Sequence, residues 1–526
     1  MKLLITDSIG PECMHYLKKY NIDVDTKFDL STADLQAIIG NYDALIVRSR
    51  TKVSKKVIDA AHKLQVIGGA GYRVDNIDLE AANNRGIMVL NAPTANVVST
   101  AEYTIAMLMA ITRKIPQANT SLHSGIWQRN VFYGTQISNK TLGVIGLGRV
   151  GSQVAKLANG LQMNVIAYDP MVSTDYARGL HVELVSLIDF LARSDFITVH
   201  VPLNPTTKGL IGASELKLVK PTVQIVNCAR EGIIDDQALL EALERGDIAA
   251  AAIDVFSQET SKGNALLGCD KVIATPQLAA YTLEAESNTG LAVAEQVLAV
   301  LNGMPAKYPV NAPSLPLEVL QLLGPYIDVA TTISSMSIQM VEGQLDSVII
   351  RYEGEIANYE TRFLKAAILS ELLKPVSEER VNIVNADLIS ASRGIQVIEE
   401  KSNVCENYTN MLIVETHTTA GVITLAGTLL HGKPHIVLIN TFWLEINPIG
   451  GYMLFTEHSD RPGMVGAVSS IIGAANVNIS NMQVCRDNSG PRAMMAVCID
   501  DPLPTELYEQ ILSLPDIYSA KIVKLE

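Results

Sequence analysis

Short apolar segments alternate with amphipathic segments over the first three hundred residues of the chain. The apolar segments are LLIT, ALIV, LQVIGG, IMVL, TLGVIG, NVIAYD, FITVH, VQIVN, AAAID and KVIAT. Between them lie segments whose apolar positions have helical spacing. Such an alternation of strands and helices is typical of parallel sheets covered by helices. We therefore predict two doubly wound α/β domains, which end with a helix over 283–301.

The pattern changes after a stretch that carries several prolines. Residues 302–305 read NGMP and residues 311–316 read NAPSLP, which are stop and linker signals. A helix near 316–342 and strands with β-branched runs, VIIRYEG and MLIVETH, then predict an α+β domain. After 450–451 a short alternation of strand, helix, strand, strand, helix, strand predicts a βαββαβ domain.

These breaks divide the chain into four expected domains. The first comprises residues 1–96 together with 285–310, and the second spans 97–284. The α+β domain covers 313–450 and the βαββαβ domain covers 451–526. A chain of 526 residues is long enough for this many cores, because domains average roughly 150 residues.

Charge and composition exclude several classes of partner. Lys and Arg total 41 against 55 Asp and Glu, and this net charge of −14 argues against a nucleic-acid partner. The longest apolar stretch, 103–111, is shorter than the ~20 residues of a membrane helix, so we expect no membrane partner. The six cysteines form no C-x-x-C pair, which predicts neither a metal site nor a disulfide framework. The N-terminal MKLLITDSIG lacks the pattern of a signal peptide, and we expect a cytoplasmic protein.

Residues 141–151 carry the clearest chemical signal. An apolar strand runs into the sequence GLGRVG at 146–151, and a helical pattern follows. In a G-x-G-x-x-G turn the glycines permit the bend, the approach of a pyrophosphate and the packing of helix on strand. The next strand ends at Asp169, whose carboxylate would accept from a ribose hydroxyl and repel a 2′-phosphate, so NAD is predicted rather than NADP. The alternative is a turn that only closes a βα unit, with Asp169 capping it.

Charged residues follow two further predicted strands. The strand 223–227 precedes Arg230, and the strand 250–254 precedes Glu259. Ligands of open α/β sheets bind at the carboxyl ends of strands. Arg230 could bind a substrate carboxylate and carbonyl, and Glu259 could orient an acid/base group. The alternative is that each belongs to an ion pair or a solvated face.

At these segments the chain resembles the D-2-hydroxyacid dehydrogenases, most closely the long-form phosphoglycerate dehydrogenases among them. The resemblance covers essentially the whole chain and rests on VRS at 47–49, VDNIDLEAA at 74–82, GLGRVG, HVPL at 200–203, VNCAREG and AAIDVF. It implies NAD-dependent oxidation of D-3-phosphoglycerate to 3-phosphohydroxypyruvate, the first step of serine biosynthesis. The first domain would then bind the substrate and the second the NAD. The cofactor contacts expected on this basis are Gly146, Gly148, Arg149, Val150, Gly151, Asp169, Cys228, Ala229, Arg230 and Asp254.

The chain departs from this family at two places. Gln277 stands in TPQLAAYT, where the family has its acid/base histidine, so we expect Arg230, Glu259 and Gln277 as the catalytic group, with a water completing the proton path. The loop GGAGYRVDN lacks the family's arginine, and Arg48, Tyr72 and Arg73 are the expected substrate contacts. Two alternatives stay open: a dehydrogenase for another 2-hydroxy acid, and a non-catalytic protein that responds to NAD and an amino acid.

The C-terminal half carries regulatory resemblances. VNIVNA at 381–386 and SRGI at 392–395 look like the intervening domain of the longest phosphoglycerate dehydrogenases, and the segment from 451 resembles an ACT domain. The second resemblance implies serine as a candidate effector, bound between two copies by His458, Asp460 and Asn478. The alternative for His458 is a solvated strand end. A shared pocket of this kind predicts a homodimer or homotetramer.

Overall fold

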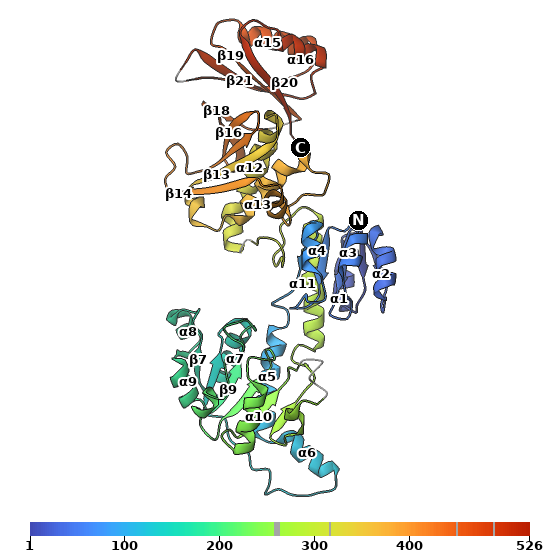
Figure 1. Ribbon diagram of the computed structural model, residues 1–526, viewed down its shortest axis with the longest axis vertical. Helices are drawn as coiled ribbons and strands as arrows, with labels where there is room; N and C mark the ends of the chain where they lie inside the picture. Colours follow the sequence, from blue (N-terminus) through green and yellow to red (C-terminus); the bar gives the residue numbers. More distant parts are fainter. Residues whose placement is uncertain (257–262, 315–316, 449–450, 488–489, 526) are drawn as a thin grey trace.

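A computed structural model of the chain describes residues 1–256, 263–314, 317–448, 451–487 and 490–525, which include four sheets. Figure 1 shows the sheets and their helices strung along one long axis, with the fourth sheet at the top and the second at the bottom. Two sheets are parallel, one is mixed and one is antiparallel. The predicted fold class, two α/β domains followed by α+β and βαββαβ domains, is therefore confirmed.

The first sheet has the strand order β2-β1-β3-β4-β5, and its strands run parallel. Its strands are β1 (Lys2–Ile5), β2 (Asp23–Thr26), β3 (Ala44–Val47), β4 (Val66–Gly69) and β5 (Met88–Leu90), and its helices are α1 (Pro11–Lys19), α2 (Thr32–Ile38), α3 (Lys55–Ala60), α4 (Leu79–Asn84) and α11 (Leu283–Leu301). Helix α11 has the bounds that the apolar pattern predicts and returns to this sheet from far along the chain. It packs so closely that a Cβ on Gly68 would lie 2.3 Å from Val293 Cγ1.

The second sheet has the order β12-β11-β10-β9-β6-β7-β8, again parallel. Its strands are β6 (Thr141–Ile145), β7 (Asn164–Tyr168), β8 (Glu183–Leu184), β9 (Phe196–Val199), β10 (Gln224–Asn227), β11 (Ala250–Ile253) and β12 (Val272–Ala274), and its helices are α5 (Val97–Thr112), α6 (Ile115–His123), α7 (Arg149–Gly160), α8 (Thr174–Gly179), α9 (Leu187–Arg193) and α10 (Asp236–Arg245). Helices α5 and α7 pack on one face, and α9 and α10 pack on the other. This two-sided cover explains why its strands read as continuous apolar runs.

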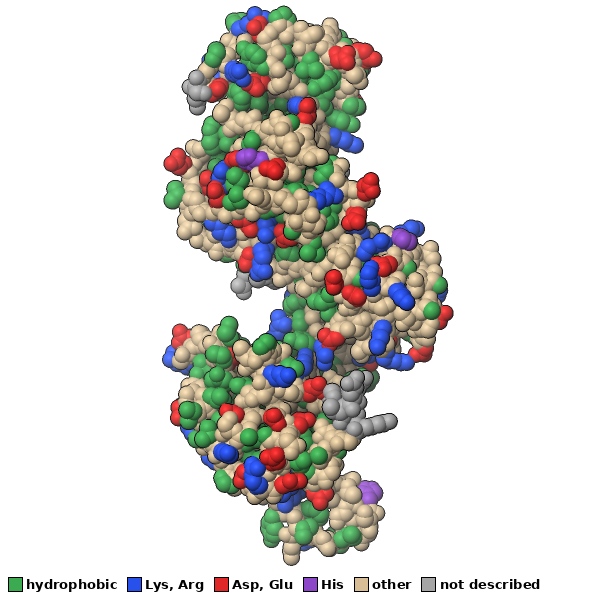
Figure 2. All heavy atoms as spheres, in the orientation of Figure 1, with side chains coloured by type: hydrophobic (Ala, Val, Ile, Leu, Met, Phe, Trp, Pro, Cys, Tyr) green, Lys and Arg blue, Asp and Glu red, His purple; other side chains and the backbone are tan. Residues whose placement is uncertain are grey.

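Helix α6 and the segment after it project from the second domain, at the bottom of Figure 1. The helix contributes no buried residue to the core. Trp127 and Tyr133, which follow it, are 77% and 79% exposed. Figure 2 shows hydrophobic side chains on this projection. Exposed apolar groups that gather in this way are typical of a protein contact surface.

The third sheet is mixed, with the order β14-β13-β15-β16-β17-β18. Its strands are β13 (Leu345–Gly354), β14 (Gln396–Ser402), β15 (Asn410–Thr418), β16 (Gly421–Leu430), β17 (Lys433–Ile439) and β18 (Phe442–Ile446), and its helices are α12 (Leu317–Met340), α13 (Arg362–Leu373) and α14 (Ala386–Ser392). Apolar residues of α12 and α13 cover one face of this sheet.

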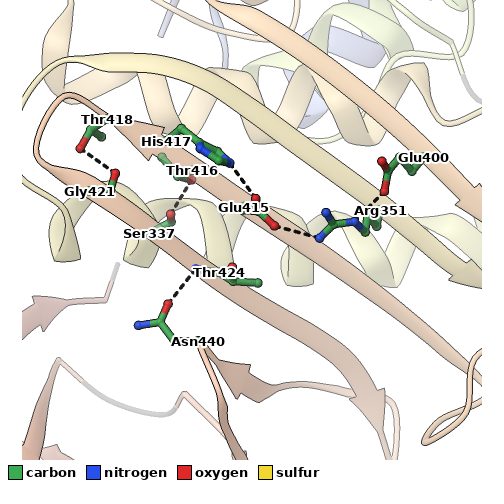
Figure 3. A network of polar contacts seen from close by, with 10 residues as sticks. All are labelled: Ser337, Arg351, Glu400, Glu415, Thr416, His417, Thr418, Gly421, Thr424 and Asn440. Atoms are coloured by element: carbon green, nitrogen blue, oxygen red, sulfur yellow. Dashed lines mark hydrogen bonds and ion pairs between the residues drawn. The ribbon is translucent and has the colours of Figure 1, made fainter.

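The other face of the third sheet carries a chain of charged groups, drawn in Figure 3. Arg351 of β13 donates to Glu400 of β14 at 2.6 Å and to Glu415 of β15 at 3.0 Å, and His417 Nε2 lies 2.7 Å from Glu415 Oε1. Burial opposes ionisation of Glu415, but the hydrogen bonds from Arg351 and His417 outweigh it and lower the pKa of this carboxyl. The network therefore joins three strands on the face opposite α12 and α13.

The fourth sheet is antiparallel, with the order β20-β21-β19-β22. Its elements are β19 (Tyr452–Ser459), α15 (Met464–Ala474), β20 (Ile479–Arg486), β21 (Arg492–Ile499), α16 (Thr505–Leu512) and β22 (Ile517–Lys524). Both helices cover one face, while Met453, Phe455 and Met494 on the other face share a hydrophobic cluster with α12. The last domain is therefore packed against the third one.

The third domain also contacts the first through the VNIVNA segment. The amide of Asn382 donates to Gly86 O at 2.7 Å, and Arg380 donates to Leu64 O at 3.3 Å. Gly86 has a φ of +62°, and a Cβ there would lie 3.0 Å from Asn385 Nδ2. A glycine is thus needed where the two domains meet. Among the helices that the structure describes, none has the length and apolar character needed to cross a membrane.

Candidate active site

The glycine turn at 146–151 has the geometry that a dinucleotide needs. Gly146 has a φ of +89°, and a Cβ on Gly151 would lie 1.9 Å from Gly146 O, so neither position accommodates a side chain. A Cβ on Gly148 would meet no atom within 4 Å, which leaves the backbone open to a ligand. No side chain caps the N-terminus of α7, and its N–H groups are available to an anion. These residues fit the pyrophosphate of a dinucleotide.

Asp169 lies directly after β7, beside this turn. One carboxylate oxygen accepts from the N–H of Leu147 at 2.8 Å, and the other accepts from the N–H of Met171 at 2.8 Å. Each oxygen keeps a further lone pair, so the carboxylate can still accept from a ribose hydroxyl. Asp169 therefore caps the turn. The same two hydrogen bonds fix the orientation of its carboxylate, to which a ribose hydroxyl could donate.

A cleft of about 720 Å³ separates the first and second domains. Figure 2 shows the molecule hollowed above the second domain, with Lys and Arg side chains near the place where the chain crosses between the domains. The cleft brings together most of the predicted site residues, which are Arg48, Tyr72, Arg73, Gly148, Arg149, Val150, Cys228, Ala229, Arg230, Asp254 and Gln277. Glu259 lies outside the described residues.

Arg230 follows β10 and is desolvated in the cleft. Burial lowers the pKa of its guanidinium, and the charge of Arg73 lowers it further. Its Nη1 donates to Ala229 O at 2.6 Å, and its Cζ lies 5.1 Å from the centre of the Tyr72 ring. Among the residues that the structure describes, it has no carboxylate partner. A desolvated cation of this kind is poised to bind an anion.

The other two predicted anion contacts already have partners. Arg73 forms an ion pair with Asp75 in the same loop. Arg48 forms an ion pair with Glu286 of α11, with Nη1 lying 3.2 Å from Oε1. Sequence reasoning missed Lys52, an exposed cleft residue for which the described parts of the chain supply no ion-pair partner. The sequence signal for Lys52 was its position, because it lies four residues after Arg48 and beyond a strand that enters the cleft.

The loop that carries Gln277 is organised by Asp254. This fully buried carboxylate accepts from Thr275 Oγ1 at 2.6 Å and from the N–H groups of Leu278 and Ala279 at 2.8 and 3.0 Å. Gln277 itself has a φ of +59°, and its side chain lines the cleft. Its amide can donate and accept hydrogen bonds but does not exchange a proton at neutral pH. Asp254 thus fixes the loop on both sides of Gln277.

His200 is the only histidine among the described residues that line the cleft. Its Nε2 lies 2.9 Å from Thr198 Oγ1, within hydrogen-bonding distance. Burial lowers the pKa of His200 to about 3, so its ring is neutral at pH 7. Burial also raises the pKa of the Cys228 thiol to about 12. Neither side chain is suited to proton transfer at neutral pH.

The three predicted effector residues lie in the fourth domain, but they do not meet within one chain. His458 and Arg486 both pair with Ala493, and Asp460 Oδ2 accepts from Arg486 at 2.8 Å. Asn478 precedes β20 at the opposite end of the strands and donates to Asp500 at 2.9 Å. His458 is 2% exposed rather than solvated, and its Nε2 has no partner among the described residues. A pocket that uses all three requires two copies.

Comparison with known proteins places each part of the chain. The NAD binding domain of the D-isomer specific 2-hydroxyacid dehydrogenases matches residues 105–279, the D-3-phosphoglycerate dehydrogenase intervening domain matches 322–440, and the ACT domain matches 452–516. D-3-phosphoglycerate dehydrogenase of Synechocystis is 41% identical over 526 residues, which cover 100% of this chain and 95% of that one. The enzyme of the same name from Methanocaldococcus jannaschii is 40% identical over 526 residues, with 100% of both chains covered.

A solved structure agrees with the first two domains. The NAD-complexed form of a D-isomer specific 2-hydroxyacid dehydrogenase from Lactobacillus delbrueckii is 25% identical, with a TM-score of 0.52. It covers 59% of this chain and 100% of that one. The similarity to the full-length relatives therefore extends through the C-terminal domains, beyond the part shared with this smaller protein.

Proposed function

The chain belongs to the D-3-phosphoglycerate dehydrogenase family, and we propose that it oxidises D-3-phosphoglycerate to 3-phosphohydroxypyruvate with NAD, the first step of serine biosynthesis. The observation that carries this proposal is the desolvated Arg230, which lines the same cleft as the glycine turn and lacks a carboxylate partner among the described residues. A 2-hydroxy acid offers the carboxylate that this cation needs.

Each residue of the cleft would have its own role in the reaction. NAD supplies the acceptor for the hydride that leaves C2 of the substrate. Arg230 binds the carboxylate through N–H groups in the plane of its guanidinium and orients C2 toward the glycine turn. Gln277, held by the Asp254 loop, donates a hydrogen bond to the oxygen on C2, and a water takes the hydroxyl proton. Glu259 completes the proposed catalytic group on the basis of the resemblance.

The substrate phosphate would lie toward the first domain. We assign Arg48, Tyr72 and Arg73 to the substrate side of the cleft, and we add Lys52 as a cation that needs no ion pair to be broken. The phosphate must otherwise compete with Asp75 for Arg73 and with Glu286 for Arg48. This arrangement favours an acid with a second anionic group over a simple monocarboxylate.

A glutamine at position 277, where an acid/base histidine is expected, favours two other candidate functions. These are a dehydrogenase for another 2-hydroxy acid and a non-catalytic protein that responds to NAD and an amino acid. A panel assay separates the three. Purified protein is mixed with NAD and D-3-phosphoglycerate, D-glycerate, D-lactate or D-2-hydroxyglutarate, and NADH formation is followed. Fastest turnover of D-3-phosphoglycerate supports the proposal. Turnover of only another acid, or NAD binding without any turnover, supports one of the alternatives.

Asp169 is expected to make the protein select NAD. Its carboxylate beside the turn repels the 2′-phosphate of NADP, so NAD should bind more tightly in calorimetric titrations of both dinucleotides. Asp169→Ser should narrow the difference, because a hydroxyl removes the repulsion and keeps a hydrogen-bonding group. Equal affinities in the wild-type protein would mean that Asp169 only caps the turn.

The fourth domain is proposed to bind serine between two copies of the chain, in a homodimer or homotetramer. The unpartnered Nε2 of His458 supports a ligand there, and the exposed apolar side chains after α6 support an oligomer. Asn478→Ala should abolish serine binding in calorimetry and leave the mass in light scattering unchanged, because the loss of one exposed amide removes little of the contact between the copies. Undiminished serine binding by this variant would argue against the pocket. A cytoplasmic location stays a prediction of the sequence pattern.

A further inference from the structure

Two arginines of the second domain meet tyrosines of the first domain across the cleft. The Cζ of Arg230 lies 5.1 Å from the centre of the Tyr72 ring, and the Cζ of Arg149 lies 5.6 Å from the centre of the Tyr308 ring. Tyr72 follows β4, and Tyr308 follows α11. Both distances are within the range of a cation–π contact. Arg230 and Arg149 are therefore each close to an aromatic ring of the opposite domain.

Asn91 binds the backbone carbonyls of both tyrosines. The side-chain amide of Asn91 donates to Tyr72 O at 2.9 Å, and the N–H of Asn91 donates to Tyr308 O at 3.3 Å. Gln296 of α11, which is 5% exposed, accepts from the N–H of Tyr308 at 2.7 Å and donates to Asn91 O at 3.0 Å. The backbone of both tyrosines is thus held by the end of β5 and by a buried amide of α11.

A contact through the face of a guanidinium differs from one through its edge. The five N–H groups of arginine lie in its plane, so a ring over the face leaves them free to bind an anion. Arg230 uses Nη1 for Ala229 O, and in the described part of the chain no carboxylate takes its other donors. Among the described residues no hydrogen bond joins Arg230 to Tyr72, so this ring can restrain the guanidinium without taking the N–H groups that the substrate needs.

We propose that Tyr72 and Tyr308 are positioning residues of the cleft. Tyr72 holds the guanidinium of Arg230 in the orientation that a substrate carboxylate requires. Tyr308 holds the guanidinium of Arg149 beside the open backbone of Gly148, where the pyrophosphate would lie. The substrate half of this assignment rests on the proposed function. Each domain then supplies half of both binding sites, and binding depends on the two domains being in register.

Calorimetry on four full-length variants tests the assignment. Tyr72→Leu and Tyr308→Leu remove the aromatic face, whereas Tyr72→Phe and Tyr308→Phe keep it. D-3-phosphoglycerate and pyruvate are titrated without cofactor, and NAD is titrated separately, so no measurement depends on turnover. Tyr72→Leu should weaken binding of the carboxylic acids about 3- to 30-fold and leave NAD unchanged, because Arg230 is desolvated. Tyr308→Leu should weaken NAD about 2- to 5-fold and leave the acids unchanged, because Arg149 is exposed.

The phenylalanine variants should bind both ligands within about 2-fold of the wild type, since the ring face is retained. Tyr518→Leu is the matched control, because it removes an arginine–tyrosine pair of the fourth domain, with Arg492 Cζ 4.8 Å from the ring, and should change neither affinity. The proposal is overturned if the leucine variants bind like the wild type. It is also overturned if each weakens both ligands equally, or if phenylalanine fails like leucine.

The substrate assignment can fail separately from this proposal. If the wild-type protein binds pyruvate but not D-3-phosphoglycerate, the proposed substrate is wrong, and the effect of Tyr72→Leu on pyruvate still decides the role of the ring. If it binds neither acid, both the proposed function and the role of Tyr72 are overturned. Near-identical thermal unfolding midpoints of all variants would show that the changes in affinity are local.

Discussion

Gln277→His is expected to raise turnover of D-3-phosphoglycerate by about 10²-fold, because general acid–base catalysis contributes that order of rate and Gln277 cannot provide it. The loop that contains position 277 can accommodate a histidine in its present backbone conformation. Asp254 holds it through three hydrogen bonds, and the φ of +59° at position 277 is one that histidine adopts more readily than most residues. The measurement is kcat with saturating NAD from pH 6 to 9.

The pH profile distinguishes proton transfer from a general improvement. The variant should acquire a limb in which kcat rises as the new imidazole loses its proton, and the wild type should lack that limb. Gln277→Leu is the matched control, since it changes the same position without adding a titratable group and should give no gain. An unchanged kcat in a histidine variant that still binds NAD would show that another group moves the proton.

Arg230→Met is expected to lower kcat/KM for D-3-phosphoglycerate by about 10²- to 10³-fold. Removing one partner of a desolvated charge pair costs about 3 to 4 kcal/mol, because the carboxylate is then left without its cation. Arg230→Lys should recover only part of the loss, since an ammonium keeps the charge but not the planar set of donors. The measurement is steady-state kinetics for both variants at saturating NAD.

A matched control excludes a nonspecific effect of losing a guanidinium. Arg178 of α8 is exposed, pairs with Asp175 and lies outside the cleft. Arg178→Met should leave kcat/KM within about 2-fold of the wild type, because exposed ion pairs contribute little. If Arg230→Met behaves like this control, the carboxylate binds elsewhere in the cleft, and Lys52 becomes the first residue to test.

Local sequence patterns were enough to predict the α/β fold class, the glycine turn and the bounds of α11. Each depends on residues close together in the chain: apolar spacing repeats within a helix or strand, and the glycines of 146–151 serve one turn. The assignment of Gln277 to the acid/base position rests on the sequence segment in which it lies, and it stays a prediction.

Contacts between distant segments could only be found in the tertiary structure. Examples are the contact between Tyr72 and Arg230, the hydrogen bond from the Gln277 loop to Asp254, and the placement of Asn478 at the far end of its sheet. A side chain's partner depends on how whole domains pack, and no local periodicity encodes that packing. Arg230 could therefore be proposed from a strand end and Arg149 from the family resemblance, whereas their contacts with Tyr72 and Tyr308 emerged only when α11 brought the first domain together beside the second.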